Sequence, residues 1–225
     1  MKKLLKHFIT FVFIFCTLVI PFGCTRINPL EKHVSELRQD VFIGQSENFS
    51  VKAHYGFKET PFNNDGKARE RIYYLTFRLL NLADSSVTYT LTMQYNGQTF
   101  NSTFKLDPVS HSLNCAIEME DFNQKNFNVT LSNGSYSEVL SLSSTLPNGT
   151  ITYLEALDKL RAEQTQLLKA YEDEDGNFNA EIYVRVIVKD SKPYWYVGIA
   201  SGNNSLKALL IDGLSGEVLA IREIF

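Results

Sequence analysis

The densest group of side chains that could bind a metal is an acidic run that begins like a calcium-binding loop. Asp173, Asp175 and Asn177 occupy the first three ligand offsets of such a loop. However, Gly176 falls at the fourth position instead of the sixth, and Val184 stands where a bidentate glutamate should be. A solvated helix end explains these charges better, so we predict neither a metal site nor a cofactor.

Residues of the types used in nucleophilic catalysis also occur close together. These residues are Asp107, Ser110, His111 and Ser112. No G-x-S-x-G turn or other nucleophile context surrounds them, and they are better explained as polar loop residues.

Cys115 and two other histidines give no clearer signal. Cys115 lies in an alternating run, which predicts a small buried side chain rather than a reactive thiol. His33 and His54 have no second histidine or cysteine at metal-ligand spacing. The sequence therefore indicates no reaction, and we expect no catalytic residues.

A run of aromatic residues is the best candidate for a binding surface. Tyr194, Trp195 and Tyr196 are consecutive, and aromatic residues are enriched at protein interfaces. The alternative is a place in the core, because aromatic residues on a strand under a helix are more often buried.

The N-terminal segment decides in which compartment these side chains would work. Lys2, Lys3 and Lys6 precede an apolar run over residues 8–20, which is shorter than the roughly 20 residues of a membrane-spanning helix. This layout predicts a secretory signal peptide over residues 1–23.

Gly23 and Cys24, at the end of the signal, resemble the lipobox of bacterial lipoproteins. The resemblance implies that Cys24 becomes the mature N-terminus, carries diacylglycerol and palmitate, and anchors the protein to the extracytoplasmic face of the cell membrane. Pro21 and Phe22 depart from the usual lipobox residues. The alternatives are an ordinary secretory signal, an uncleaved anchor, or a disulfide between Cys24 and Cys115.

The composition of the chain is that of an ordinary globular protein, with 44% hydrophobic and 21% charged residues. The roughly 200 residues after the signal suffice for one large or two small cores. A net charge of −3 gives no electrostatic footprint for nucleic acid, which we do not expect as a partner.

Periodicity predicts a tether followed by an all-β domain. We interpret residues 24–45 as a lipid-anchored tether with a short helical start. The start rests on apolar residues spaced by three and four positions: Leu30, Val34, Leu37 and Val41. Residues 46–146 hold about seven short alternating strands with turn signals such as Asn96-Gly97, which predicts an antiparallel β-sandwich of immunoglobulin-like size. We recognise no family in this part.

The pattern over residues 150–225 predicts a smaller α+β domain. Thr152 and Glu155 form a capping box at the start of a helix of about 20 residues. Four alternating strands follow, over residues 180–189, 194–199, 206–211 and 218–224. A helix laid on such a meander buries both apolar faces.

The end of this unit carries a motif. The aromatic strand over residues 194–198 precedes Ile211-Asp212 and Gly216-Glu217-Val218, with Ser215 in place of a threonine. This arrangement resembles the end of a PepSY-type domain, where an aromatic strand precedes V-D-x-x-T-G-E-V. The resemblance implies a small export-side module that binds or inhibits peptidases and has no catalytic residues of its own.

Together with the anchor, these patterns favour a non-catalytic cell-envelope lipoprotein that binds a protein or peptide or modulates a peptidase. The alternative is an extracytoplasmic enzyme whose site is assembled from residues distant in sequence. A pocket of His, Asp, Glu or Ser side chains with shifted pKa values would favour the enzyme.

Overall fold

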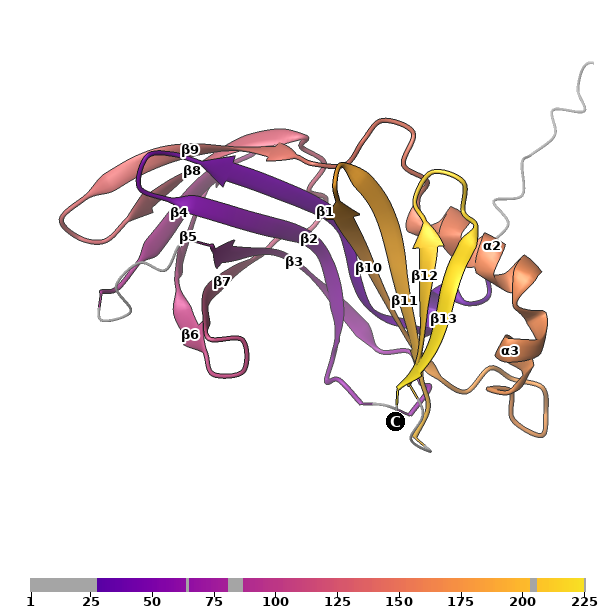
Figure 1. The fold of residues 1–225 in the computed structure, drawn as a ribbon. Coiled ribbons are helices and arrows are strands. Elements are labelled where there is room, and N and C mark those ends of the chain that lie inside the picture. Colours follow the sequence, from indigo (N-terminus) through magenta and orange to yellow (C-terminus); the bar gives the residue numbers. More distant parts are fainter. Residues whose placement is uncertain (1–27, 64, 81–86, 203–205, 225) are drawn as a thin grey trace, which may run out of the picture.

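Strands dominate the computed structural model, which describes residues 28–63, 65–80, 87–202 and 206–224 (Figure 1). The strands are β1 (Val34–Gln45), β2 (Ser50–Thr60), β3 (Glu70–Leu79), β4 (Thr90–Tyr95), β5 (Gln98–Thr103), β6 (Lys105–Asp107), β7 (Ser112–Glu118), β8 (Asn126–Ser132), β9 (Ser137–Ser144), β10 (Glu181–Lys189), β11 (Lys192–Ala200), β12 (Leu206–Asp212) and β13 (Val218–Ile224). The helices are the 3-10 turn η1 (Glu31–His33), α2 (Tyr153–Glu163) and α3 (Thr165–Lys169). The β-rich class predicted from the alternation is confirmed.

The turn between β4 and β5 is formed by Asn96 and Gly97, as predicted. Asn96 and Gly97 both have positive φ angles, 48° and 77°, and Tyr95 pairs with Gln98 on either side of them. Such angles match the right-handed twist of the flanking strands, which explains why Asn-Gly stands here.

Strand β1 corrects the prediction for residues 24–45. Residues 34–45 form a long strand inside the sheet, not a helical start or a tether. Two β-bulges, between Val34 and Glu36 and between Arg38 and Asp40, each shift the alternation by one residue. The apolar residues therefore recur at mixed spacings that imitate a helix.

All the described strands belong to one hydrogen-bonded sheet. Nine of them follow the order β13-β12-β11-β10-β1-β2-β3-β7-β6. The other four strands form a second path that starts at β5. β5 pairs with β4, β4 with β8 and β8 with β9, and β9 pairs with β1. The β5–β7 seam is bridged where Ser102 Oγ donates to the Ala116 carbonyl at 2.9 Å. The sheet thus nearly closes on itself, which differs from the predicted sandwich of two separate sheets because β9 joins the two layers.

Two strands share one edge of β1. β10 pairs with it in parallel from Val34 to Arg38, and β9 pairs with it at Phe42 and Ile43. The opposite edge pairs with β2 as far as Gln45. β1 is therefore the strand at which the sheet forks.

Two hydrophobic cores lie on either side of this fork. The N-terminal core is filled from the curled part of the sheet, by residues such as Val51, Leu75, Leu91 and Leu131. The C-terminal core combines Leu157 and Trp195 with side chains of β1 and β2, which include Val34, Leu37 and Phe57. Since β1 also gives Phe42 to the N-terminal core, it contributes to both.

The helical segment lies against one side of β10–β13, and none of the described helices covers the other side (Figure 1). Its capping box is present, with Thr152 Oγ1 accepting from the Glu155 amide at 3.2 Å. The single helix predicted here is divided at Gln164, where φ is −117°. No helix among the described residues is long and apolar enough to cross a membrane.

Candidate anion-binding site

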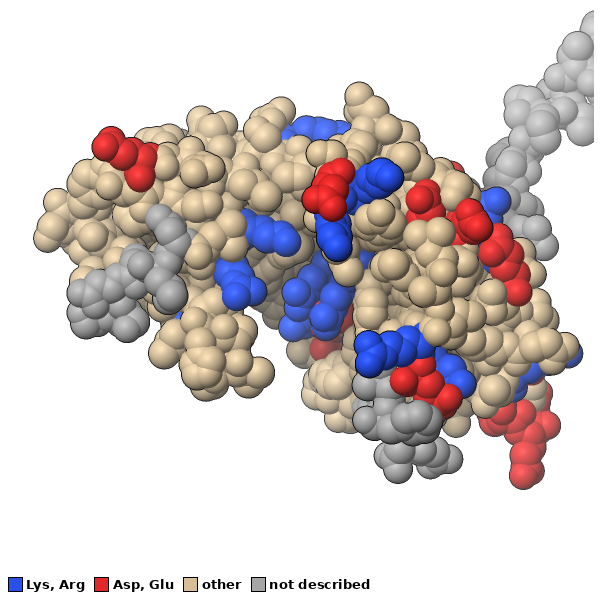
Figure 2. All heavy atoms as spheres, in the orientation of Figure 1, with Lys and Arg blue, Asp and Glu red and all other residues tan. Residues whose placement is uncertain are grey.

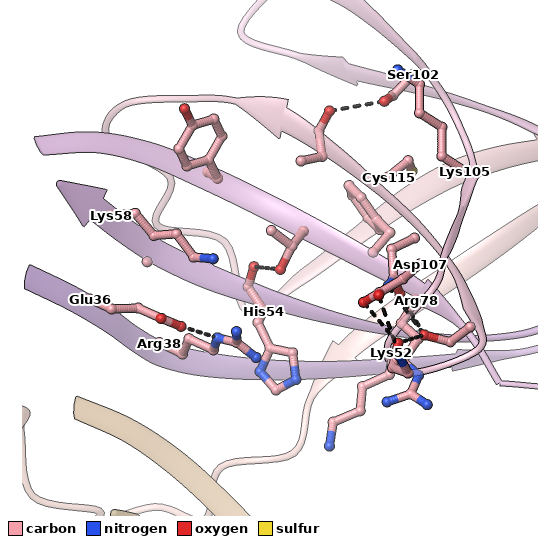
Figure 3. Close-up of a pocket in the computed structure, with 18 of the residues that line it drawn as sticks. Glu36, Arg38, Lys52, His54, Lys58, Arg78, Ser102, Lys105, Asp107 and Cys115 are labelled. Atoms are coloured by element: carbon pink, nitrogen blue, oxygen red, sulfur yellow. Dashed lines mark hydrogen bonds and ion pairs between the residues drawn. The ribbon is translucent and has the colours of Figure 1, made fainter. Parts of the chain in front are cut away.

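A hollow of about 970 Å³ lies on the outer face of β1, β2, β3, β6 and β7. Figure 2 shows Lys and Arg side chains gathering in this hollow below β2 and β3, and Figure 3 shows the side chains that line it. Five of the lining residues are Lys or Arg and two are acidic. The basic residues are Arg38, Lys52, Lys58, Arg78 and Lys105.

Strand alternation places these cations on the face away from the cores. Val51, Ala53 and Tyr55 of β2 fill the N-terminal core, so Lys52 and His54 point to the opposite face. On β3, the same alternation buries the residues on either side of Arg78. The basic side chains of the hollow thus lie along the outer faces of adjacent strands.

The strand register brings cations from distant parts of the chain together. Lys52 is opposite Arg78, Arg78 is opposite Asn114, and Asn114 is opposite Lys105. Residues directly opposite in a sheet share a face, and neighbouring strands are about 4.8 Å apart. A row of polar and basic side chains therefore crosses β2, β3, β7 and β6.

Glu36 is the buried acidic residue of the hollow, and its charge is neutralised by cations. One carboxylate oxygen accepts from Arg38 Nε at 2.8 Å and the other from Arg185 Nη2 at 3.1 Å. Burial alone would raise the pKa of Glu36, but Arg38, Arg185 and Lys58 together lower it. Glu36 thus orients the two arginines, and it forms no ion pair with the other cations of the hollow.

Cations surround His54 at the centre of the hollow. Burial, Lys52 and Arg38 lower the pKa of His54 to about 4, and its Nδ1 is a buried atom without a hydrogen-bond partner among the described residues. Burial, Arg78 and Arg38 also lower the pKa of Lys52. A cleft lined by one sign of charge attracts ligands of the opposite sign.

Asp107, the second acidic residue, is occupied within its own turn. Its side chain accepts from the Val109 amide at 2.8 Å and from Ser110 Oγ at 2.8 Å, and these bonds lower its pKa. His111 has a positive φ of 49° at the same turn. The sequence group of Asp107, Ser110, His111 and Ser112 therefore forms a turn at the edge of the hollow, as its interpretation as polar loop residues predicted.

Cys115 lies at the wall of the hollow with its side chain in the N-terminal core. It is 7% exposed and forms no disulfide with a described residue, and burial raises the pKa of its thiol to about 12. The prediction of a small buried side chain is confirmed.

The predicted aromatic residues lie on opposite faces of β11. Trp195 is 2% exposed in the C-terminal core, and its Nε1 donates to the Ile151 carbonyl at 3.0 Å. It therefore offers no surface to a partner in the folded chain. Tyr194 and Tyr196 are half-buried on the helix-free face, where a binding role stays a prediction. Cys24 lies outside the described residues.

The acidic run after α3 folds as a turn around one aspartate. Asp173 Oδ1 accepts from the Asp175 amide at 3.0 Å and the Asn177 amide at 2.8 Å. Among the residues that the structure describes, no cluster of His, Cys, Asp and Glu has the arrangement of a metal site.

The basic hollow was not predicted, although one signal for it was present. Lys52, His54 and Lys58 all occupy even positions of one strand, so its outer face is basic. The sequence did not reveal the strand register that brings Arg38 and Arg78 to the same hollow as Lys52 and His54. Arg38 lies in the segment that was predicted to be a tether, and Arg78 lies on another strand. Neither a protein-family model, nor a curated protein, nor a solved structure matches this chain.

Proposed function

We propose that this protein is a non-catalytic, lipid-anchored binding protein of the cell envelope whose basic hollow holds an anionic ligand. The observation that carries the proposal is a cluster of cations around His54: Lys52, Lys58 and Arg78 form no ion pair with any described residue, and Arg38, held by Glu36, lies beside them. An anion would relieve their mutual repulsion and accept hydrogen bonds from them.

The chemistry of the hollow favours binding over catalysis. A nucleophile needs a base within hydrogen-bond reach, whereas the Cys115 thiol is buried with a raised pKa and Asp107 is held by backbone amides. With a pKa near 4, His54 is neutral at physiological pH and sits among cations rather than beside a nucleophile. The enzyme alternative therefore lacks an assembled pair in this hollow.

Binding of long-chain sodium polyphosphate to the full chain tests this function. We expect affinity that falls with increasing salt. The double substitution Lys52→Gln/Lys58→Gln should weaken binding about tenfold, since each lysine donates charge-assisted hydrogen bonds.

The matched control is Lys159→Gln/Lys169→Gln, which removes the same two charges from exposed positions on α2 and α3. It should leave the affinity nearly unchanged. Equal weakening by both double variants would mean that only the net charge matters, and the proposed site would be wrong.

The envelope location rests on Gly23-Cys24 and is tested separately. Replacing Cys24→Ala should move the protein from the membrane to the soluble fraction, because the proposed lipid would have no attachment point. Membrane partition of the variant equal to that of the parent chain would favour an uncleaved anchor.

A peptide partner is a second candidate, favoured by the exposed edge of the sheet. We propose that residues 150–225 act as a PepSY-like α+β module and that β13, whose free edge ends the sheet, accepts an extended peptide by strand addition. Leu219 and Ile221 are 45% and 46% exposed there. The test is whether Ile221→Pro, which removes a backbone donor at the edge, abolishes binding of a peptidase or peptide captured by the parent chain.

A further inference from the structure

Beside the hollow, the helix-free face of β10 and β11 continues the sheet from β1. Ile182 and Val184 point into the C-terminal core, so Arg185 points to the other side. Arg185 pairs in register with Arg38 of β1 on one side and with Tyr196 of β11 on the other. Tyr196, Arg185 and Arg38 therefore form a row that continues the basic face of the hollow.

The same row reaches a second tyrosine beyond β1. Arg38 is opposite Gly56 of β2, and Gly56 is opposite Tyr74 of β3. The order of residues across the sheet is therefore Tyr196, Arg185, Arg38, Gly56 and Tyr74. At about 4.8 Å per strand, the two tyrosines are roughly 19 Å apart along the sheet.

The side chains of this row are accessible and partly unsatisfied. The side chains of Arg38 and Arg185 are 37% and 40% exposed, and both tyrosines are half-buried. Arg185 Nε is a buried donor without a partner among the described residues. Glu36 accepts a hydrogen bond from each guanidinium group, so both groups are oriented before any ligand binds.

We infer that this row binds an acidic polysaccharide, an inference that rests on the proposed anion-binding function. The carboxylates of such a polymer can accept bidentate hydrogen bonds from Arg38 and Arg185. The apolar C–H faces of its sugar rings can pack on the faces of Tyr74 and Tyr196, which carry partial negative charge. A polyphosphate would satisfy the cations but leave the tyrosines unused, and a neutral glucan would leave the arginines unpaired.

The experiment compares three polymers on the full chain by isothermal titration calorimetry: polygalacturonate, sodium polyphosphate and neutral dextran. We expect polygalacturonate to bind most tightly and dextran not to bind. Tyr196→Ala and Tyr74→Ala should each weaken polygalacturonate about fivefold and leave polyphosphate unchanged. The control is Tyr95→Ala, a half-buried tyrosine at the end of β4, which should alter neither affinity.

The outcomes separate this inference from the proposed function. Binding of polyphosphate with no preference for polygalacturonate, or with no effect of the two tyrosine substitutions, would overturn the polysaccharide and leave the anion site standing. Absence of binding by both anionic polymers would overturn both. Equal binding of dextran would show that charge does not select the ligand.

Discussion

His54 is the residue whose titration reports most directly on the charge of the hollow. Its pKa is lowered to about 4 by burial and by Lys52 and Arg38. An NMR titration of its ring should therefore show a midpoint far below the ordinary 6.5. A midpoint near 6.5 would mean that the site is more solvated, or less positive, than described.

The same shift predicts how His54 affects stability. Because the folded pKa lies below the unfolded one, protons bind preferentially to the unfolded chain. His54 should therefore reduce the free energy of unfolding as pH falls from about 6.5 towards 4, and His54→Asn should make that fall shallower. Denaturant titrations at several pH values measure the difference between parent and variant.

The thiol of Cys115 should not react with thiol reagents in the native protein. Its thiol is 7% exposed and burial raises its pKa to about 12, whereas reaction requires the thiolate. In a chain with Cys16 and Cys24 changed to serine, a maleimide should label Cys115 only after denaturation. Rapid labelling of the native chain at neutral pH would show that the wall of the hollow opens.

At the scale of single residues, sequence reasoning succeeded where the local pattern determines the environment. The alternating run around Cys115 was enough to predict its burial. It did not predict the lowered pKa of His54, because Lys52 is near in sequence but Arg38, the other main cation beside it, belongs to another strand. That proximity depends on strand register, which a single sequence does not reveal.

Among the elements, β1 is the one on which the architecture depends, and Gly56 tests its contact with β2. A Cβ atom at Gly56 would overlap the Leu37 carbonyl oxygen of β1, a backbone atom that cannot move aside without shifting the strand. Gly56→Ala should therefore lower the free energy of unfolding by about 3 kcal/mol, the upper end of overpacking effects.

The control is Gly198→Ala on β11, where the new Cβ would lie 3.3 Å from a Leu206 side-chain atom and 3.5 Å from Tyr183. These side chains can adjust, so the loss should be clearly smaller. Chemical denaturation monitored by circular dichroism compares the two variants. Equal losses would show that β1 does not approach β2 as closely as described.

The elements after residue 150 were more predictable than β1. The capping box at Thr152 and the four later strands are local patterns, and each strand begins and ends within two residues of its predicted range. The turn between the first two strands lies at Asp190 and Ser191, because Lys192 and Pro193 already belong to β11. In β1 the bulges break the alternation, so its apolar residues imitate a helix. The division of the helix at Gln164 was also missed, because no proline or glycine marks it.

For the whole molecule, the shared strand predicts cooperative unfolding. β1 contributes Phe42 to the N-terminal core and Val34 and Leu37 to the C-terminal core. Trp195, the single tryptophan of the chain, reports on the C-terminal core, while far-UV circular dichroism reports on all strands. The two signals should change at the same denaturant concentration. Two separated transitions would show that the cores are independent units.

If the hollow formed by β1, β2 and β3 binds anions, the titration of His54 at its centre should respond to the bound anion. The NMR titration of His54 should be repeated with saturating sodium polyphosphate. An anion bound beside Lys52 and Arg38 would cancel part of their charge and favour the imidazolium, so the pKa should rise from about 4 towards 6.5. A midpoint that stays near 4 at saturating polyphosphate would contradict anion binding in the hollow.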